Sequence, residues 1–176
     1  DLSSTSPDVT ELLGIVHDNN DSGVWVAVGY GSPSGNDIFR STDGQNFSKV
    51  TTTMTNPISV TYMDGYFYTL TRDGDVYRSS DGNTWTFRSA PYNQDDFDHR
   101  IYAAGNTILV SGGSVGTDQQ VRRSDDLGLT WSDTGLNFVD DITSDGQAYK
   151  VNSVAYKNGI YAIGVSGGAN DGIHLF

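Results

Sequence analysis

Two stretches of the sequence gather carboxylates closely enough to bind a cation. Each holds three aspartates within a few residues, and the six are Asp95, Asp96, Asp98, Asp140, Asp141 and Asp145. Neighbouring carboxylates repel unless a cation neutralises them, and Ca²⁺ takes about six to eight oxygen ligands from flexible loops of this kind. The pattern predicts a calcium site in either stretch, although neither fits the EF-hand spacing. The alternative is a solvated acidic loop balanced by Arg100 or Lys150.

Aromatic and amide side chains accompany the first acidic stretch. Tyr92, Asn93 and Phe97 lie in it or beside it, and Tyr30 ends a predicted apolar strand. Aromatic rings offer apolar faces for sugar rings, while amides and carboxylates bind hydroxyl groups. These residues predict a site for a glycan or a cell-surface receptor. The alternative role is packing between structural units, which we favour for Phe138.

Acid–base catalysis is the reaction chemistry that these carboxylates could support. A glycosidase that uses two aspartates could pair Asp95 or Asp98 with Asp140. The sequence contains neither a nucleophile elbow nor a phosphate-binding loop. Its three histidines, His17, His99 and His174, are too dispersed to suggest a metal site.

Three copies of a short polar motif indicate the elements that must position these loops. Each copy has a serine, an aspartate, a glycine and a closing aromatic residue, and each follows a strand-like run that ends in arginine. The copies are Ser41, Asp43, Gly44 and Phe47; Ser79, Asp81, Gly82 and Trp85; and Ser124, Asp126, Gly128 and Trp131. The aspartates are separated by 38 and then 45 residues (81 − 43 and 126 − 81), which is typical of a repeat architecture.

The motif resembles the Asp box of the bacterial neuraminidase repeat, which occurs in sialidases and in many other β-propellers. The resemblance implies a turn between the third and fourth strands of each blade, with a role in folding and a position away from the active site. A sialidase would also need an arginine triad, a tyrosine with a glutamate partner and an aspartate acid/base. The one glutamate is Glu11, near the start of the chain, and among the seven arginines Arg40, Arg78 and the pair Arg122 and Arg123 flank the boxes, away from the expected site. We therefore expect that the protein is not an enzyme.

The rest of the sequence predicts an all-β fold with one domain over residues 1–176. Strand-like runs and turn signals divide it into a small β-propeller of about four four-stranded antiparallel blades. Ser59–Gly65 and Ser153–Gly159 share the pattern S-V-x-Y-x-x-G at equivalent places in the second and fourth blades. The fourth blade ends after its third strand, so we expect part of Asp1–Thr10 to pair beside Ile173–Phe176 and close the ring. The alternatives are an open stack of blades and a fragment of a larger ring.

The charge and the composition of the chain disfavour some classes of binding partner. The formal net charge of −12 disfavours nucleic acid and anionic membranes, which are polyanions themselves. No apolar run is long enough to predict direct membrane insertion. The chain begins with Asp1 and contains no cysteine. We expect it to be part of a longer chain that oligomerises through a missing N-terminal region.

These observations together predict a non-enzymatic receptor- or carbohydrate-binding module. The setting we expect is host attachment from the extracellular space or a virion surface, as at the distal tip of a bacteriophage spike. One alternative is a propeller fragment of a glycoside hydrolase, either sialidase-like or dependent on aspartates. Another is a structural propeller that binds other proteins.

Overall fold

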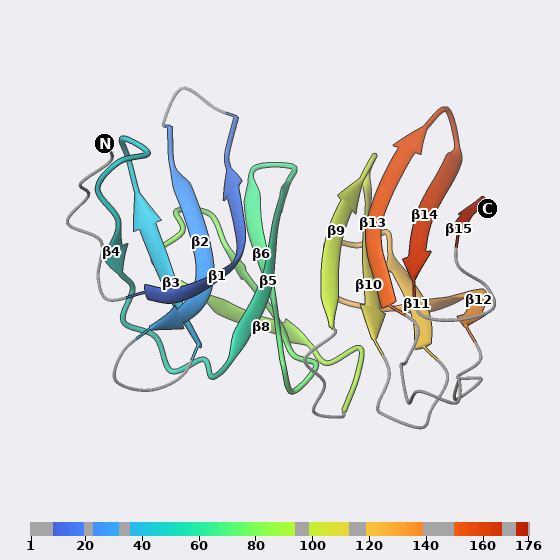
Figure 1. The fold of residues 1–176 in the computed structure, drawn as a ribbon, viewed down its shortest axis with the longest axis horizontal. Helices are drawn as coiled ribbons and strands as arrows, with labels where there is room; N and C mark the ends of the chain where they lie inside the picture. Colours follow the sequence, from blue (N-terminus) through green and yellow to red (C-terminus); the bar gives the residue numbers. More distant parts are fainter. Residues whose placement is uncertain are drawn as a thin grey trace.

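The computed structural model describes residues 9–19, 23–31, 36–93, 99–112, 119–138, 150–166 and 172–175. All regular structure in this part of the chain is β-strand, and it includes no helix of the length and apolarity that a membrane span needs. The strands form four antiparallel sheets arranged as the blades of a β-propeller (Figure 1). The predicted all-β propeller of four blades is therefore confirmed.

Each sheet follows the order of its strands in the sequence. The first blade is β1 (Val9–His17), β2 (Trp25–Gly31), β3 (Asn36–Ser41) and β4 (Ser48–Lys49). The second blade is β5 (Pro57–Met63), β6 (Tyr66–Thr71), β7 (Val76–Ser79) and β8 (Thr86–Ser89). The third blade is β9 (Arg100–Ala104), β10 (Thr107–Gly112), β11 (Gln119–Ser124) and β12 (Ser132–Phe138). The fourth blade is β13 (Lys150–Lys157), β14 (Ile160–Ser166) and β15 (Gly172–Leu175).

The fourth blade has three strands among the described residues. The predicted closure by Asp1–Thr10 falls mostly on residues 1–8, which lie outside the described part of the chain. Its last two residues, Val9 and Thr10, belong to β1, where Val9 is in register with Gly31 of the first blade. Ring closure through the N-terminal segment stays a prediction.

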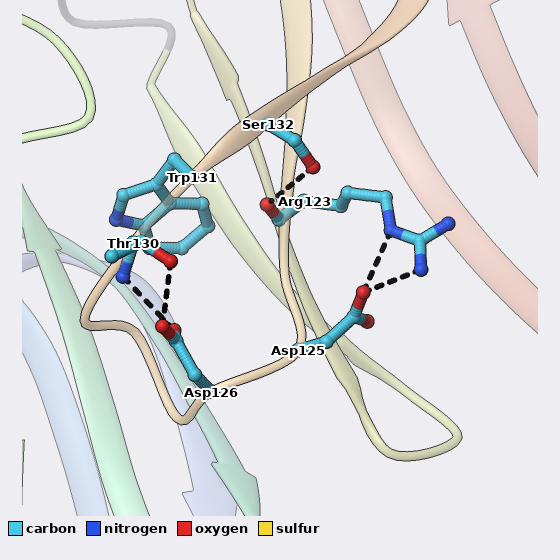
Figure 2. Close-up of a pocket in the computed structure, with 6 residues that line it drawn as sticks. All are labelled: Arg123, Asp125, Asp126, Thr130, Trp131 and Ser132. Carbon is cyan, nitrogen blue, oxygen red and sulfur yellow. Dashed lines mark hydrogen bonds and ion pairs between the residues drawn. The ribbon is translucent and has the colours of Figure 1, made fainter.

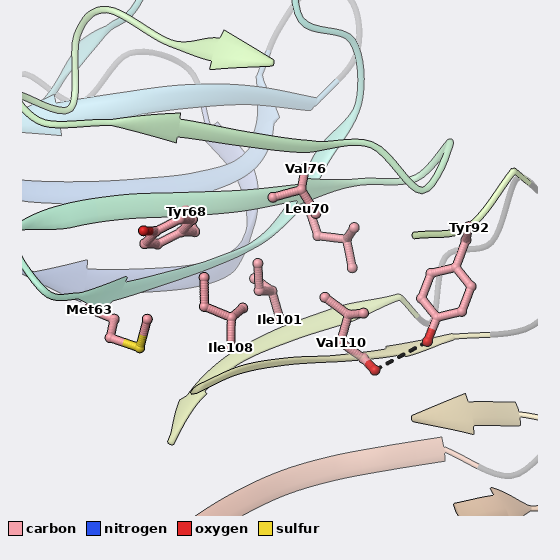
Figure 3. Close-up of a cluster of buried hydrophobic side chains, with 8 residues drawn as sticks. All are labelled: Met63, Tyr68, Leu70, Val76, Tyr92, Ile101, Ile108 and Val110. Carbon is pink, nitrogen blue, oxygen red and sulfur yellow. Dashed lines mark hydrogen bonds between the residues drawn. The ribbon is translucent and has the colours of Figure 1, made fainter. Parts of the chain in front are cut away.

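Three apolar clusters hold consecutive blades together. Val26, Val28 and Ile38 of the first blade pack with Phe67 of the second. Figure 3 shows the next cluster, in which Tyr68, Leu70 and Val76 of the second blade meet Ile101, Ile108 and Val110 of the third. The last cluster joins Leu109 and Val121 of the third blade to Ile163 and Val165 of the fourth. Because strand residues alternate between faces, each internal sheet contributes one row of side chains to each neighbour.

Hydroxyl groups also connect the inner strands of neighbouring blades. Ser59 Oγ in β5 accepts a hydrogen bond from the Ile101 amide in β9 at 3.1 Å. Thr61 Oγ1 accepts one from the Ala103 amide, also at 3.1 Å. β9 is the first strand of its sheet, so the amides of Ile101 and Ala103 have no strand partner on the side that faces β5. The two hydroxyl groups satisfy these amides and thereby fix how β5 and β9 lie against each other.

The predicted Asp boxes form turns supported by their own side chains. In the third copy, Asp126 Oδ1 accepts bonds from Ser124 Oγ at 2.8 Å and from the Thr130 amide at 2.9 Å. Ser124 Oγ in turn accepts the Gly128 amide at 2.9 Å. The copies around Asp43 and Asp81 repeat this pattern. Because all these partners lie within four residues of the aspartate, the turn depends little on the rest of the protein.

The boxes also fasten each blade to the preceding one. Arg40 of the first blade donates from Nε to the Asp81 carbonyl in the second box, at 2.8 Å. Ser89 of the second blade donates to the Gly128 carbonyl in the third box at 2.6 Å and accepts a bond from Trp131 Nε1 at 2.8 Å. Trp85 and Trp131 also pack against the clusters between blades. We call the end of the propeller that carries the boxes the box end.

Candidate functional site

The opposite end of the propeller carries the connections between second and third strands and the linkers between blades, and we call it the loop end. Much of the site predicted there lies outside the described residues. This applies to Phe97 and to all six predicted calcium ligands, Asp95, Asp96, Asp98, Asp140, Asp141 and Asp145. Within the described ranges, no three histidine or acidic side chains gather closely enough to hold a metal ion. The calcium site therefore stays a prediction.

Tyr92 lies at the loop end, but its ring is buried, with 8 % of the residue exposed. One face stacks on His99, with ring centroids 4.9 Å apart, and the Arg122 guanidinium lies 5.0 Å from the ring centre. Its hydroxyl donates to the Val110 carbonyl at 3.1 Å. The structure corrects the expectation of an exposed ring, because contacts with the third blade and the linker already surround the ring of Tyr92.

The two other described residues of the predicted binding set are more accessible. Asn93 is exposed directly after Tyr92, and Tyr30 is half-buried near the end of β2. The Tyr30 carbonyl accepts a bond from Thr10 Oγ1 at 3.4 Å, which ties the loop ends of β2 and β1 together. Both residues keep polar groups at the loop end, on different blades.

A turn of the second blade brings two further carboxyl groups to the loop end. The turn joins β6 to β7 through Arg72, Asp73, Gly74 and Asp75. The Thr71 amide donates to the Asp75 carbonyl at 2.9 Å, and the Asp75 amide donates to Thr71 Oγ1 at 3.1 Å.

The same turn packs closely on the linker between the second and third blades. A Cβ at Gly74 would lie 2.6 Å from the Tyr92 carbonyl oxygen, and its φ of +88° also favours glycine. His99, fully buried, approaches the Thr71 carbonyl with Nδ1 at 3.4 Å. Asp73 and Asp75 thus lie in a turn that contacts the start of the linker, directly before Asn93.

The two carboxyl groups of this turn differ in environment. Asp73 is exposed and accepts a hydrogen bond from Thr55 Oγ1 at 3.3 Å. Asp75 is half-buried; burial raises the pKa of its carboxyl above the usual range, and the nearby Asp73 carboxylate raises it further. A carboxyl group whose pKa is raised by burial keeps its proton to a higher pH than an exposed aspartate does, which is what a proton donor requires.

The sequence alone did not predict a role for Asp73 and Asp75, because the run Asp73-Gly74-Asp75 indicates only a turn between two strands. A turn signal says where the chain reverses but not which side chains become buried. The available clue was the position of the turn, between second and third strands, on the end already expected to carry function.

A hollow of about 310 Å³ lies at the box end of the third blade, and Figure 2 shows the residues that line it. Arg123 binds Asp125 through Nε at 3.1 Å, beside Asp126, Thr130, Trp131 and Ser132. Hydrogen bonds from Arg123 and Thr107 lower the pKa of Asp125. Bonds from the Thr130 side chain and amide lower the pKa of Asp126 to about 2. Both carboxylates are therefore ionised at neutral pH and committed to the turn, which makes them poor proton donors.

No protein-family model and no curated sequence matches the chain. Its fold is similar to that of the Trypanosoma rangeli sialidase bound to the inhibitor DANA, with 17 % identity and a TM-score of 0.59 over 93 % of this chain and 32 % of the sialidase. It is also similar to a GH43 endo-arabinanase from Bacillus licheniformis, with 16 % identity and a TM-score of 0.51 over 97 % of this chain and 73 % of the enzyme. A third similar structure is YCF48 bound to a D1 peptide, with 15 % identity and a TM-score of 0.52 over 96 % of this chain and 60 % of YCF48. The chain spans about a third of the length of the sialidase.

These similarities define the class as β-propeller and correct one prediction. We expected a non-enzymatic module because no complete sialidase residue set is present in the sequence. The solved structures that share the fold include a sialidase and an endo-arabinanase, both enzymes, and this contradicts the exclusion of an enzyme. The exclusion assumed one residue set, although propellers support glycoside hydrolysis with different sets of residues.

Proposed function

We propose that the protein is a glycoside-hydrolase-like propeller that binds a glycan at its loop end and uses a carboxyl group there as a proton donor. The observation that carries the proposal is the raised pKa of Asp75 beside Asp73, in the turn between β6 and β7. Glycoside hydrolysis needs a carboxylic acid that stays protonated to assist the leaving group, and a second carboxylate that acts on the other side of the sugar.

Asp75 is the proton donor in this proposal. Burial stabilises the protonated form, so the carboxyl can donate to a glycosidic oxygen at a pH where an exposed aspartate is ionised. The second carboxylate comes from the aspartates that the sequence predicts for catalysis, Asp95, Asp98 or Asp140. Asn93 is exposed beside the turn and offers an amide for sugar hydroxyls.

Glycan recognition is common to this proposal and to the receptor-binding role predicted from the sequence. Attachment to a host cell, an extracellular or virion-surface location and a bound calcium ion stay predictions. If calcium orders the acidic stretches, chelation will lower the thermal stability of the wild-type protein, which a melting curve with and without chelator measures.

A screen of the wild-type protein against α- and β-linked oligosaccharides, including sialosides and arabinans, tests the proposal. We expect hydrolysis of one substrate class, with Asp75→Asn reducing kcat/KM by roughly 100- to 10,000-fold. Asp64→Asn is the matched control, because Asp64 lies at the box end with a φ of 52°, which asparagine tolerates. Binding of a glycan without any hydrolysis would disprove the enzymatic part, and full activity of Asp75→Asn would disprove the role of Asp75.

A further inference from the structure

The four blades share three apolar clusters, so the two terminal blades each pack on one face only among the described residues. The clusters lie between the first and second, second and third, and third and fourth blades. The inner strands follow the same order, with β5 in contact with β1 and β9, and β13 in contact with β9. No comparable packing joins β13 to β1 in the described part of the chain.

The outward face of the fourth blade exposes three large apolar side chains, with Lys157 and Ser153 on the same face. Strand register puts Ala162 opposite Ala155 and Leu175, and Gly164 opposite Ile173, so these side chains share one face with Ile160. The alternate residues Tyr161, Ile163 and Val165 point into the cluster with the third blade. The exposed fractions are 55 % for Ile160, 77 % for Ile173 and 66 % for Leu175. We call Ile160, Ile173 and Leu175 the blade-4 face.

The first blade exposes two apolar side chains on the inner strand of its outward face, whereas Ala27 and Phe39, which the register puts on the same face, are buried. Leu12 pairs with Gly29 and Ile15 with Ala27, whereas the alternate residues Val26 and Val28 point into the cluster with the second blade. Leu12 is 59 % exposed and Ile15 is 52 % exposed. We call these two residues the blade-1 face; they lie on the inner strand β1.

These two faces hold five of the eight large hydrophobic residues that are exposed in the described part of the chain; the other three are Phe87, Leu129 and Tyr156. Exposed apolar side chains that gather on one face mark a surface that another surface covers. Scattered exposure would distribute them over all four blades, so the concentration on the outward faces of the terminal blades indicates two missing contacts.

The repeated S-V-x-Y-x-x-G pattern says what kind of contact is missing. In the second blade, Ser59 of this pattern accepts a backbone N–H from the inner strand of the next blade. Its equivalent in the fourth blade, Ser153, is exposed, on the same face as Ala155 and Ala162. The fourth blade therefore presents, at Ser153, the same kind of side chain that in the second blade binds the inner strand of the following blade.

We propose that the blade-4 face of one molecule packs against the blade-1 face of a second copy of this chain. The contact repeats the relation that each blade already has with the next, with Ile173 and Leu175 against Leu12 and Ile15. It is a head-to-tail contact between different surfaces, and two copies joined twice form a ring of eight blades, within the usual range of about four to eight. A strand added beside β15 would cover the edge of the sheet and leave this face exposed.

The test is the molar mass of the wild-type protein in solution over a wide range of concentrations, by light scattering coupled to size-exclusion chromatography. We expect twice the chain mass of 19.0 kDa. Because each chain has a net charge of −12, association should strengthen as salt screens the repulsion.

Two double variants test the blade-1 face and the blade-4 face one at a time. Leu12→Asp with Ile15→Asp, and Ile173→Asp with Leu175→Asp, should each give monomers that keep the wild-type circular dichroism spectrum. Mixing the two should restore a dimer through the one intact pair of faces. Leu129→Asp is the matched control, because Leu129 is 51 % exposed at the box end and should leave the dimer intact.

Other outcomes overturn the proposal. A wild-type protein that is monomeric at all concentrations, or a dimer that both double variants leave unchanged, contradicts it. One double variant that stays dimeric while the other is monomeric would indicate contact between identical faces, and a mixture of two monomeric variants that stays monomeric would also contradict the head-to-tail contact. A monomeric wild type whose melting temperature falls in either double variant would show that the same chain covers its own faces.

Discussion

At the box end, Asp126 binds the serine and the amides of its own turn, whereas at the loop end Asp75 is half-buried between a turn and a linker. The pKa of Asp126 falls to about 2, while that of Asp75 rises. The same side chain thus becomes a permanently charged part of a turn in one place and a potential proton donor in the other. The two pKa values shift in opposite directions because Asp126 accepts several hydrogen bonds that stabilise its charge, whereas burial at Asp75 disfavours the charged form.

The box end and the loop end contribute different properties, the first to stability and the second to the proposed activity. The box end contributes hydrogen bonds that hold each turn and fasten it to the preceding blade, so substitutions there should lower the free energy of unfolding. The loop end contributes Asp75, whose carboxyl has a raised pKa, so under the proposed function substitutions there should change activity while stability stays nearly constant.

Trp131→Ala should have the largest effect on stability, lowering the free energy of unfolding by about 3 kcal/mol. The indole packs against the cluster between the second and third blades and donates to Ser89 Oγ at 2.8 Å. Urea unfolding measures the change, and Phe87→Ala serves as control because Phe87 is 52 % exposed. If Trp131→Ala and Phe87→Ala lower the free energy of unfolding equally, Trp131 has no special role in stabilising the fold.

Asp126→Ala should cost about 1 kcal/mol at neutral pH, as is typical when a capping side chain in an exposed turn is lost. Because the folded pKa is lowered to about 2, this stabilisation is present above the unfolded-state pKa of about 4 and disappears as pH falls through the folded value. Unfolding of both proteins between these pH values should show the difference shrinking. A difference that is independent of pH would mean that the charge of Asp126 contributes nothing.

Asp73→Asn should have the smallest effect, a change in pH dependence with almost no change in stability. Asp73 raises the pKa of Asp75, so its removal should lower that pKa. A proton donor is active while protonated; the fall in kcat/KM at high pH should therefore begin at a lower pH in the variant than in the wild type. The pH profile of the active substrate measures this. A shift to higher pH would contradict the assignment of Asp75 as the donor.

The predictions that succeeded concern features that short segments decide. The three boxes, their aromatic residues and the Asp64–Gly65 and Asn158–Gly159 turns were found from sequence because serine, aspartate and glycine act on neighbours a few residues away. The blade count followed from the spacing of the boxes. The predicted binding set was less successful, because the exposure of Tyr92 depends on His99, Arg122 and Val110, which come from other parts of the chain.

The sequence by itself therefore determined the strands, the turns and the repeat, since these follow from local hydrogen bonding and alternation. The tertiary structure alone decided which carboxyl groups are buried. Gly74 meets Tyr92 and Thr55 meets Asp73 only after separate blades and linkers pack together. Asp75 is half-buried in the turn between β6 and β7, five large apolar side chains on the outward faces of the terminal blades stay exposed, and neither effect is encoded in the spacing of residues along the chain.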